Sequence, residues 1–174
     1  MKDKSGVGVE IERKYIIEKP DFERLREAAG YTVSDIVQIY LPAENGQTHR
    51  VRSRAYKDKT VYIETRKIRI DKMSVTEIER EIEEDEFLRL SENIAEGTRP
   101  VVKRRHTLDL GVTVAEIDEY PEWSNTCIME TELPSRDTEV SFPPYIRIIR
   151  EVTGERAYSN ASMSKCFPKE EGTV

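Results

Sequence analysis

Charged and apolar side chains alternate along most of this chain, and the alternation predicts a protein built mainly of β-strands. The first such run places Glu10, Glu12 and Lys14 at every second position, with Ile11 and Tyr15 in the other phase. Successive side chains of a strand point to opposite faces, so one face of this strand is charged and the other is apolar. The same reasoning predicts strands at residues 9–17, 36–41, 48–54, 61–67, 75–83, 101–108, 112–120 and 126–133.

Three segments have helical spacing instead. In residues 20–30 a proline suits the first turn, apolar residues form one stripe, and a glycine suits the carboxyl-terminal end. Residues 84–95 repeat the apolar stripe, and a short helix is expected within 146–152. Many short strands separated by turn residues are typical of a meander that closes on itself. We therefore expect an α+β fold, a closed antiparallel eight-stranded β-barrel forming a tunnel with charged inner faces, and helices packed outside.

The composition fits a single folded domain. Of the 174 residues, 37% are hydrophobic and 36% are charged, which is more polar than an average globular domain. Disorder is disfavoured because the charges alternate with apolar residues instead of forming blocks. We expect one domain over residues 1–164 and a poorly ordered tail over residues 165–174. The formal net charge of -6 argues against a nucleic-acid partner, although local positive clusters can bind a small anion.

The sequence also bears on the environment of the protein. Cys127 and Cys166 are the only cysteines, and neither lies in a metal-binding or redox spacing, so we expect reduced thiols. The first residues lack the apolar stretch of a signal peptide, and no apolar run approaches the roughly 20 residues that span a bilayer. A soluble, cytoplasmic protein without a membrane partner is the resulting expectation. The oligomeric state stays open, a homodimer included.

Basic side chains recur at every second position of two predicted strands. Arg50, Arg52 and Arg54 share one strand face, and Lys103 and Arg105 share another. Guanidinium groups in a row repel each other unless anions lie between them, and arginine is suited to bidentate contacts with phosphate or carboxylate. A solvated edge strand that uses charge to discourage aggregation explains the arginine row equally well.

Acidic side chains recur in the same way. Acid pairs share a strand face at Glu10 and Glu12, at Glu116 and Asp118, and at Glu130 and Glu132. Carboxylate oxygens favour Mg²⁺ or Mn²⁺ over Zn²⁺. The strand over residues 75–83 has four acids on one face. Of these, Glu79 and Glu81 are expected to pair with cations opposite them instead of binding metal.

Lys67, His49 and His106 fall outside these rows. Lys67 is in phase with the apolar residues of its strand, so a bulge or strand end is expected if it joins a charged interior. Both histidines lie in the opposite phase from the basic residues of their strands and are expected to be structural. No serine or cysteine has the partners of a nucleophile. Phosphoryl transfer needs none, because a metal and cations can neutralise charge and align water.

The motifs, in this order along the chain, resemble one known family. They are Glu10-Ile11-Glu12-Arg13-Lys14, Gln38-Ile39-Tyr40-Leu41, Arg50-Val51-Arg52, Thr65-Arg66-Lys67, Glu79-Arg80-Glu81, Lys103-Arg104-Arg105, Glu116-Ile117-Asp118, Glu130-Thr131-Glu132 and residues 152–160. Over nearly its entire length the chain is similar to the CYTH superfamily, the triphosphate tunnel metalloenzymes, which include CyaB-like adenylyl cyclases and thiamine triphosphatases. It departs from the family pattern at Arg156, where many relatives have lysine, at Glu77, where arginine is frequent, and at Arg54, which extends the usual arginine pair.

The resemblance implies an antiparallel barrel that binds triphosphate compounds together with Mg²⁺ or Mn²⁺. The implied metal ligands are Glu10, Glu12, Asp118, Glu130 and Glu132. The implied phosphate-binding cations are Lys14, Arg50, Arg52, Lys67, Lys103, Arg105 and Arg156. The implied catalytic residues are Lys14, Glu12 and Glu130, and Glu79, Glu81 and Glu116 form the supporting network of ion pairs.

Members of the family hydrolyse inorganic, thiamine or nucleoside triphosphates, and some cyclise ATP. The first motif resembles that of the triphosphatases, and residues 1–9 contain neither His nor Phe, unlike the His-Phe pair associated with class IV adenylyl cyclases. We therefore expect a triphosphatase, with tripolyphosphate as the first candidate substrate. A class IV-type adenylyl cyclase and a thiamine or nucleoside triphosphatase are the alternatives. A non-catalytic polyphosphate-binding barrel is an alternative of another class, against which the retained acid pairs argue.

Overall fold

Nine β-strands and four short helical segments form the part of the protein that the computed structural model describes, residues 5–44 and 46–172. The strands are β1 Ser5–Glu18, β2 Thr32–Leu41, β3 Gln47–Tyr56, β4 Lys59–Arg69, β5 Ser74–Ile82, β6 Val101–Asp109, β7 Val114–Glu119, β8 Thr126–Glu132 and β9 Ile148–Glu151. The helical segments are α1 Phe22–Leu25, α2 Glu84–Ser91, the 3₁₀ helix η1 Arg156–Tyr158 and α3 Asn160–Met163. The first four residues of the predicted domain and the last two of the predicted tail lie outside the described residues.

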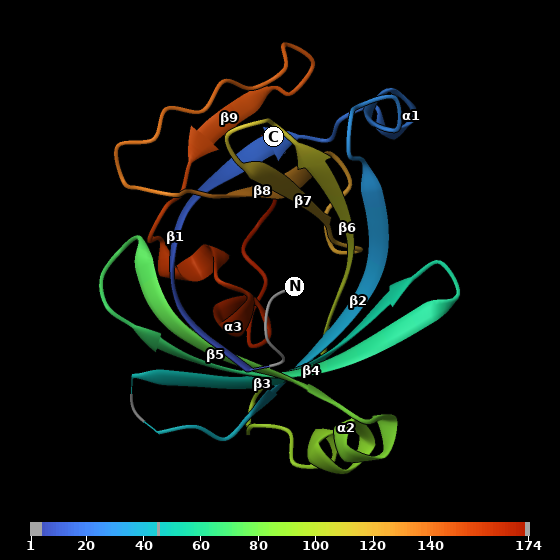
Figure 1. Ribbon diagram of the computed structural model, residues 1–174, viewed down its shortest axis with the longest axis vertical. Helices are drawn as coiled ribbons and strands as arrows, with labels where there is room; N and C mark the ends of the chain where they lie inside the picture. Colours follow the sequence, from blue (N-terminus) through green and yellow to red (C-terminus); the bar gives the residue numbers. More distant parts are fainter. Residues whose placement is uncertain (1–4, 45, 173–174) are drawn as a thin grey trace.

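The strands form one antiparallel sheet that curves into a ring (Figure 1). Its order is β5-β4-β3-β2-β6-β7-β8-β1-β9, with an additional pairing of β5 with β1. The length of β1 allows this, because residues 5–11 pair with β5, residues 12–18 pair with β8, and residues 15–17 also pair with β9. The antiparallel sheet is thus confirmed. The closed eight-stranded barrel is corrected to a nine-stranded sheet whose two end strands, β5 and β9, both pair with β1.

The ninth strand takes the place of a predicted helix. β9 lies within residues 146–152, where the apolar residues have helical spacing but hydrogen bonds to β1 override this weak local signal. The helix predicted over residues 20–30 is a single turn, α1, capped by the side chain of Asp21. α2 begins as predicted and ends at Ser91 instead of Ala95. Short helices are sufficient here because packing on the sheet stabilises them.

Two apolar clusters lie on the outer face of the sheet. The first contains Leu25 of α1, Ile117 and Met129. The second contains Val51 and Phe87, the latter from α2. Each helix therefore covers one cluster, and Figure 1 shows both helices outside the ring. For α1 and α2 the prediction that helices pack outside is confirmed.

A third apolar cluster lies on the inner face. Ile16 follows Lys14 by two residues on β1 and therefore shares its face. It belongs to one buried cluster with Tyr120, with Tyr158 of η1 and with Met163 of α3. Figure 1 shows α3 within the outline of the ring. The prediction that helices pack outside is therefore wrong for α3, because the inner face is apolar beyond the charged rows and needs a cover there.

The segment after α3 packs against this inner cluster. The ring of Phe167 lies 5.4 Å from that of Tyr120 and 6.0 Å from that of Trp123. The indole Nε1 of Trp123 donates a hydrogen bond of 3.1 Å to the carbonyl of Pro168. This part of the predicted tail is packed instead of loose, while the domain boundary before Lys165 stays a prediction.

Two further expectations concern the cysteines and membrane-spanning helices. Both cysteines are free, Cys127 buried and Cys166 exposed. Among the helices of the described residues, none combines the length and the apolar character needed to cross a membrane.

Candidate functional site

Charged side chains from several strands meet on the inner face of the sheet. They are Glu10, Glu12 and Lys14 from β1, Arg50 and Arg52 from β3, Lys67 from β4, Glu77 and Glu79 from β5, Lys103 and Arg105 from β6, Glu116 and Asp118 from β7, and Glu130 from β8. The pairing register places opposite charges side by side, with Lys14 across from Glu130 and Arg105 across from Asp118. The alternation that predicted these rows therefore also brings them together.

Lys67 reaches the inner face without the predicted bulge. The register between β3 and β4 is continuous, with Thr48 across from Lys67 and Arg50 across from Thr65. Lys67 therefore shares the face of Arg50. The expectation of a bulge is wrong because the inner face is not charged along its whole length, so the apolar residue Ile63 in the same phase also points inward.

The β6–β8 cluster, which we define as Lys103, Arg105, Glu116, Asp118 and Glu130, is closely hydrogen bonded. Asp118 is completely buried and accepts a bond of 2.6 Å from Lys103 Nζ. Arg105 donates bonds of 2.7 Å to both oxygens of Asp118, pairs with Glu116, and reaches Glu130 at 3.3 Å. Burial acts to raise the pKa of Asp118, but the charges of Arg105 and Lys103 lower it. Burial and the neighbouring Arg105 lower the pKa of Lys103 to about 8.

Lys14 connects this cluster to β1. Its Nζ lies 2.7 Å from Glu130 Oε1 and donates a 3.4 Å bond to the carbonyl of Tyr158. Burial opposes the charge of Lys14, yet the carboxylates of Glu130 and Glu12 raise its pKa above the ordinary lysine value. Lys14 is therefore a permanent cation at neutral pH, which suits charge neutralisation and not proton abstraction.

The β3–β5 cluster, which we define as Arg50, Arg52, Lys67, Glu77 and Glu79, is more loosely paired. Lys67 Nζ lies 2.9 Å from Glu77 Oε1, and Arg50 Nη2 lies 3.5 Å from the same oxygen. Arg52 Nη2 lies 3.3 Å from Glu79 Oε1. Both arginines reach across β4, which separates them from the acids of β5. Within the described residues, the Nε atoms of Arg50 and Arg52 are buried without a hydrogen-bond partner.

Glu10 shares Lys67 with Glu77. Lys67 Nζ lies 2.7 Å from Glu10 Oε2. Burial acts to raise the pKa of Glu10, but a hydrogen bond with Glu77 and the charge of Lys67 lower it to about 2. Burial and the same hydrogen bond raise the pKa of Glu77 to about 7. One proton between the two carboxyls thus reduces their repulsion near neutral pH.

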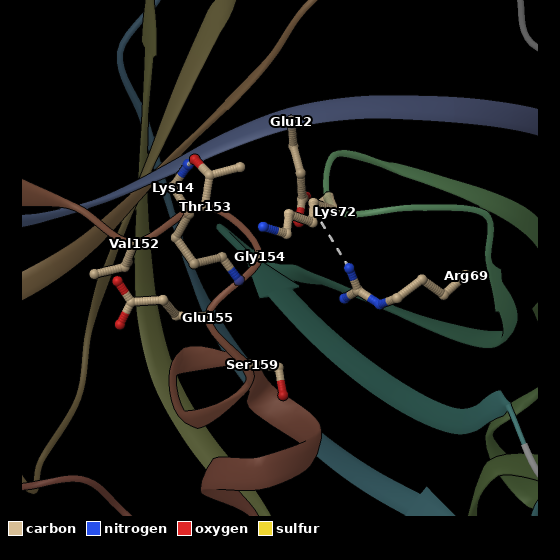
Figure 2. Close-up of a pocket in the computed structure, with 9 residues that line it drawn as sticks. All are labelled: Glu12, Lys14, Arg69, Lys72, Val152, Thr153, Gly154, Glu155 and Ser159. Carbon is tan, nitrogen blue, oxygen red and sulfur yellow. Dashed lines mark hydrogen bonds between the residues drawn. The ribbon is translucent and has the colours of Figure 1, made fainter.

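A small pocket opens beside these clusters, where β1 meets the β4–β5 turn and the β9–η1 loop. Its lining residues are Glu12, Lys14, Arg69, Lys72, Val152, Thr153, Gly154, Glu155 and Ser159. Figure 2 shows Glu12 and Lys14 pointing into it from β1, with Lys72 and Arg69 approaching from the other side. The two loops touch at Gly154, whose φ is +76° and where an added Cβ would lie 3.1 Å from Lys72 Cβ.

Arg69 and Lys72 are the cations of this pocket that the sequence analysis missed. Arg69 follows Lys67 by two residues on β4, so the same alternation could have identified it. Its Nη1 donates to the carbonyls of Asp71 and Lys72 at 3.1 and 3.4 Å, which stabilises the turn. Lys72 lies in that turn and has no periodic signal.

The donor set on β1 and β8 fits a hard divalent cation by its chemistry. Glu12 pairs with Glu132 across the two strands, which places like charges opposite each other. Burial and the nearby Glu130 raise the pKa of Glu12, and its carboxylate makes no ion pair within the described residues. Oxygen-only ligands are those that Mg²⁺ and Mn²⁺ prefer. The described side chains group no three carboxylates, cysteines or histidines around one point. Glu10 and Glu130 are paired with Lys67 and Lys14.

Some predicted site residues lie apart from these clusters. Arg156 is exposed on η1, and within the described residues its side chain makes no ion pair. Glu81 and Glu132 are exposed near the ends of β5 and β8, and neither forms an ion pair within the same residues. Arg54 donates to the hydroxyl of Ser34 at 3.1 Å instead of facing an acid. The roles assigned to these residues from the sequence stay predictions.

Both histidines make structural contacts, as expected. His49 Nε2 lies 2.6 Å from Glu64 Oε1. His106 stacks on Phe22 with ring centroids 4.0 Å apart, and its Nδ1 lies 2.9 Å from the hydroxyl of Tyr31. Neither histidine belongs to the inner-face clusters.

Among known proteins, the chain is similar to several solved structures. No family model and no curated protein matches it. The inorganic triphosphatase NE1496 aligns with a TM-score of 0.58 and 26% identity, over 92% of this chain and 97% of that one. PH1819 from Pyrococcus horikoshii OT3 aligns with a TM-score of 0.57 and 24% identity, over 74% of this chain and 80% of the other. HpAC1 from Hippeastrum, an adenylyl cyclase candidate described as having a dominant triphosphatase activity, aligns with a TM-score of 0.51 and 13% identity, over 72% and 80%.

Proposed function

We propose that this chain, which has the fold of the triphosphate tunnel proteins of the CYTH superfamily, is a divalent-metal-dependent hydrolase of small triphosphates, with inorganic tripolyphosphate as its substrate. The neighbour that aligns over 97% of its own length is named an inorganic triphosphatase, which supports hydrolysis as the reaction.

Six cations converge on the inner face, and this convergence carries the proposal. They are Lys14, Arg50, Arg52, Lys67, Lys103 and Arg105. Each of them lies within 4.0 Å of a carboxylate oxygen, and a phosphate oxygen that displaces the carboxylate can make the same contact. A triphosphate carries negative oxygens along its whole length, and cations from several strands can bind it from several sides at once.

The acid pairs of β1 and β8 complete the site. Glu10, Glu12, Glu130 and Glu132 would hold Mg²⁺ or Mn²⁺, which when bound neutralises phosphate charge and lowers the pKa of a bound water. Asp118 was expected to join this set, but unlike Glu130 it is completely buried, and Lys103 and Arg105 engage both of its oxygens. In this proposal it orients those two cations.

The residues of the chain then act by electrostatics and position. Lys14 and Arg105 stay charged and stabilise the negative charge that develops on the transferred and leaving phosphates. The arginines of β3 and Lys67 bind the remaining phosphates. Lys14 does not act as a base, because its pKa is raised.

The composition of the pocket favours an inorganic triphosphate over a nucleotide. Of the residues that line it, only Val152 has a purely apolar side chain, and none is aromatic. A base or a thiamine ring normally packs on apolar or aromatic side chains. The described pocket beside the charged clusters offers no such platform.

Product analysis tests the proposal. Tripolyphosphate, thiamine triphosphate and ATP are each incubated with the protein and Mg²⁺ or Mn²⁺, or with EDTA, and orthophosphate, pyrophosphate and cyclic AMP are measured. We expect orthophosphate and pyrophosphate from tripolyphosphate, with no turnover in EDTA. Cyclic AMP as the main product would establish the cyclase alternative. Binding of tripolyphosphate without any turnover would establish the non-catalytic alternative.

A matched pair of variants tests the metal site. Glu12→Gln removes a carboxylate without breaking an ion pair within the described residues, so we expect a folded protein with turnover reduced about 10- to 100-fold. Glu18→Gln, at the far end of the same strand, changes an exposed acid paired with Arg147 and should leave turnover unchanged. Equal activity of the two variants would show that Glu12 holds no metal.

A further inference from the structure

Glu77 lies between two of the cations that are proposed to bind phosphate. Its Oε1 is 2.9 Å from Lys67 Nζ and 3.5 Å from Arg50 Nη2, and its side chain is 9% exposed. It points inward from β5 directly across from Lys67 in the pairing register. A single carboxylate oxygen therefore occupies the place between an ammonium and a guanidinium.

A phosphate oxygen makes the same contacts with these cations as a carboxylate oxygen does. The two ligands therefore exclude each other at Arg50 and Lys67. The carboxylate also serves the arginine poorly, because the contact is long and Arg50 Nε is buried without a partner within the described residues. A phosphate group offers more acceptor oxygens than one carboxylate and can satisfy both donors.

We propose that Glu77 is an internal competitor of the substrate, whose carboxylate occupies Arg50 and Lys67 in the free protein and is displaced when a polyphosphate binds. This inference rests on the proposed function and adds a residue that sets affinity. The cost of the displacement is subtracted from the binding free energy. Glu77 thus weakens substrate binding although it lies inside the site.

The alternative role of Glu77 predicts the opposite sign. If Glu77 served mainly to hold Arg50 and Lys67 in position, its removal would loosen both cations and weaken polyphosphate binding. If it competes, its removal frees Arg50, leaves Lys67 paired with Glu10 alone, and strengthens binding. The direction of the change in affinity therefore decides between competition and positioning.

Calorimetric titration of tripolyphosphate measures that direction. EDTA is present throughout, so that metal binding does not contribute, and all proteins are compared in the same buffer at about pH 8.5. We expect Glu77→Gln to bind tripolyphosphate about tenfold more tightly than the wild type. Glu83→Gln is the control, because Glu83 directly follows β5, is exposed and makes no ion pair within the described residues. Its affinity should equal that of the wild type.

A second variant keeps the test possible if Glu77→Gln does not fold. Glu77→Asp keeps the charge but shortens its reach, so it should move the dissociation constant in the same direction by a smaller factor. Wild-type binding with unchanged or weaker binding by these variants would overturn the competition while leaving the phosphate site intact. Absence of tripolyphosphate binding by the wild type in EDTA would overturn the inference, whereas turnover of tripolyphosphate with Mg²⁺ or Mn²⁺ in the product analysis would leave the proposed function standing.

Discussion

The two charged clusters of the inner face contain the same residue types but hold them in different ways. In the β6–β8 cluster, Asp118 is completely buried and joins Lys103 and Arg105 through bonds of 2.6 and 2.7 Å. In the β3–β5 cluster, Arg50 and Arg52 of β3 reach across β4 to acids of β5. Their Nη2 atoms lie 3.5 and 3.3 Å from the nearest carboxylate oxygens. The shortest bonds of the first cluster join the adjacent strands β6 and β7, whereas both arginines of the second cluster reach across β4.

This difference bears on how free each arginine is to bind a ligand. Arg105 uses most of its donors within its own cluster, so it is fixed before any ligand arrives. Arg50 and Arg52 keep buried Nε donors without partners within the described residues, and an unsatisfied buried donor costs free energy that a ligand can recover. We infer that the side chains of the β6–β8 cluster are fixed before a ligand binds, whereas those of the β3–β5 cluster can rearrange on binding. We call these the fixed cluster and the adaptable cluster.

Removal of the central acid of the fixed cluster should have the largest effect. Asp118→Asn leaves Lys103 and Arg105 buried with less compensating charge, so we expect a loss of about 3–5 kcal/mol in the free energy of unfolding, measured by urea denaturation. Asp35→Asn is the control, because Asp35 of β2 pairs with Arg104 on the exposed outer face of β6 and should cost less than about 1 kcal/mol. Similar losses in the free energy of unfolding for both variants would contradict the inference that the β6–β8 cluster is fixed.

Loss of a cation from the adaptable cluster should affect binding more than stability. Arg52→Gln removes a guanidinium whose one acid, Glu79, keeps a 2.9 Å hydrogen bond from Thr65. We expect tripolyphosphate to bind about 10- to 100-fold more weakly in calorimetric titrations, with little change in urea denaturation. Arg66→Gln, on the exposed outer face of β4, should bind as the wild type does. A large stability loss with unchanged affinity would make Arg52 structural.

Loss of a cation from the pocket beside both clusters should have a smaller effect on tripolyphosphate binding. Lys72 is exposed, so its attraction for a polyanion is screened by water and salt. Lys72→Gln is expected to weaken tripolyphosphate binding by up to about fivefold at low salt, and the difference should vanish at high salt. Lys57→Gln, in the β3–β4 hairpin away from the pocket, should have no effect at either salt concentration. A defect that persists at high salt would indicate a direct contact inside the site.

The alternation of charge predicted most of the fold and of the charged face. Eight of the strands, the antiparallel sheet and the inward direction of the charges were predicted from side-chain alternation together with short apolar runs and turn residues. The resemblance to the triphosphate tunnel fold is confirmed by solved structures. The ninth strand was missed because residues 146–152 have helical spacing, and only pairing with β1 decides their conformation. The inward packing of α3 was missed because four residues have too little periodicity to indicate a face.

The sequence predicted which residues meet but not how they pair. Alternation places Glu77 and Glu79 on the inner face, yet only the register across β4 assigns them to Arg50 and Arg52. Arg156 was assigned to the site by resemblance, although no periodic pattern supported it, and it is exposed in the structure. Pairing depends on contacts between strands distant in sequence, which a single sequence does not encode locally.

The smallest expected effect concerns the outer face of β6, behind the fixed cluster. Burial lowers the pKa of His106 despite the nearby Glu119, so folding favours the neutral imidazole. As pH falls through about 6.5 the unfolded chain takes up a proton before the folded protein does, and stability decreases until pH falls below the folded pKa. His106→Gln cannot titrate, so urea denaturation at about pH 7 and pH 5 should show a smaller loss for the variant than for the wild type. Because the inner-face carboxylates titrate in both proteins, the difference between the two losses isolates the outer face. Equal losses would mean that His106 is not the residue responsible.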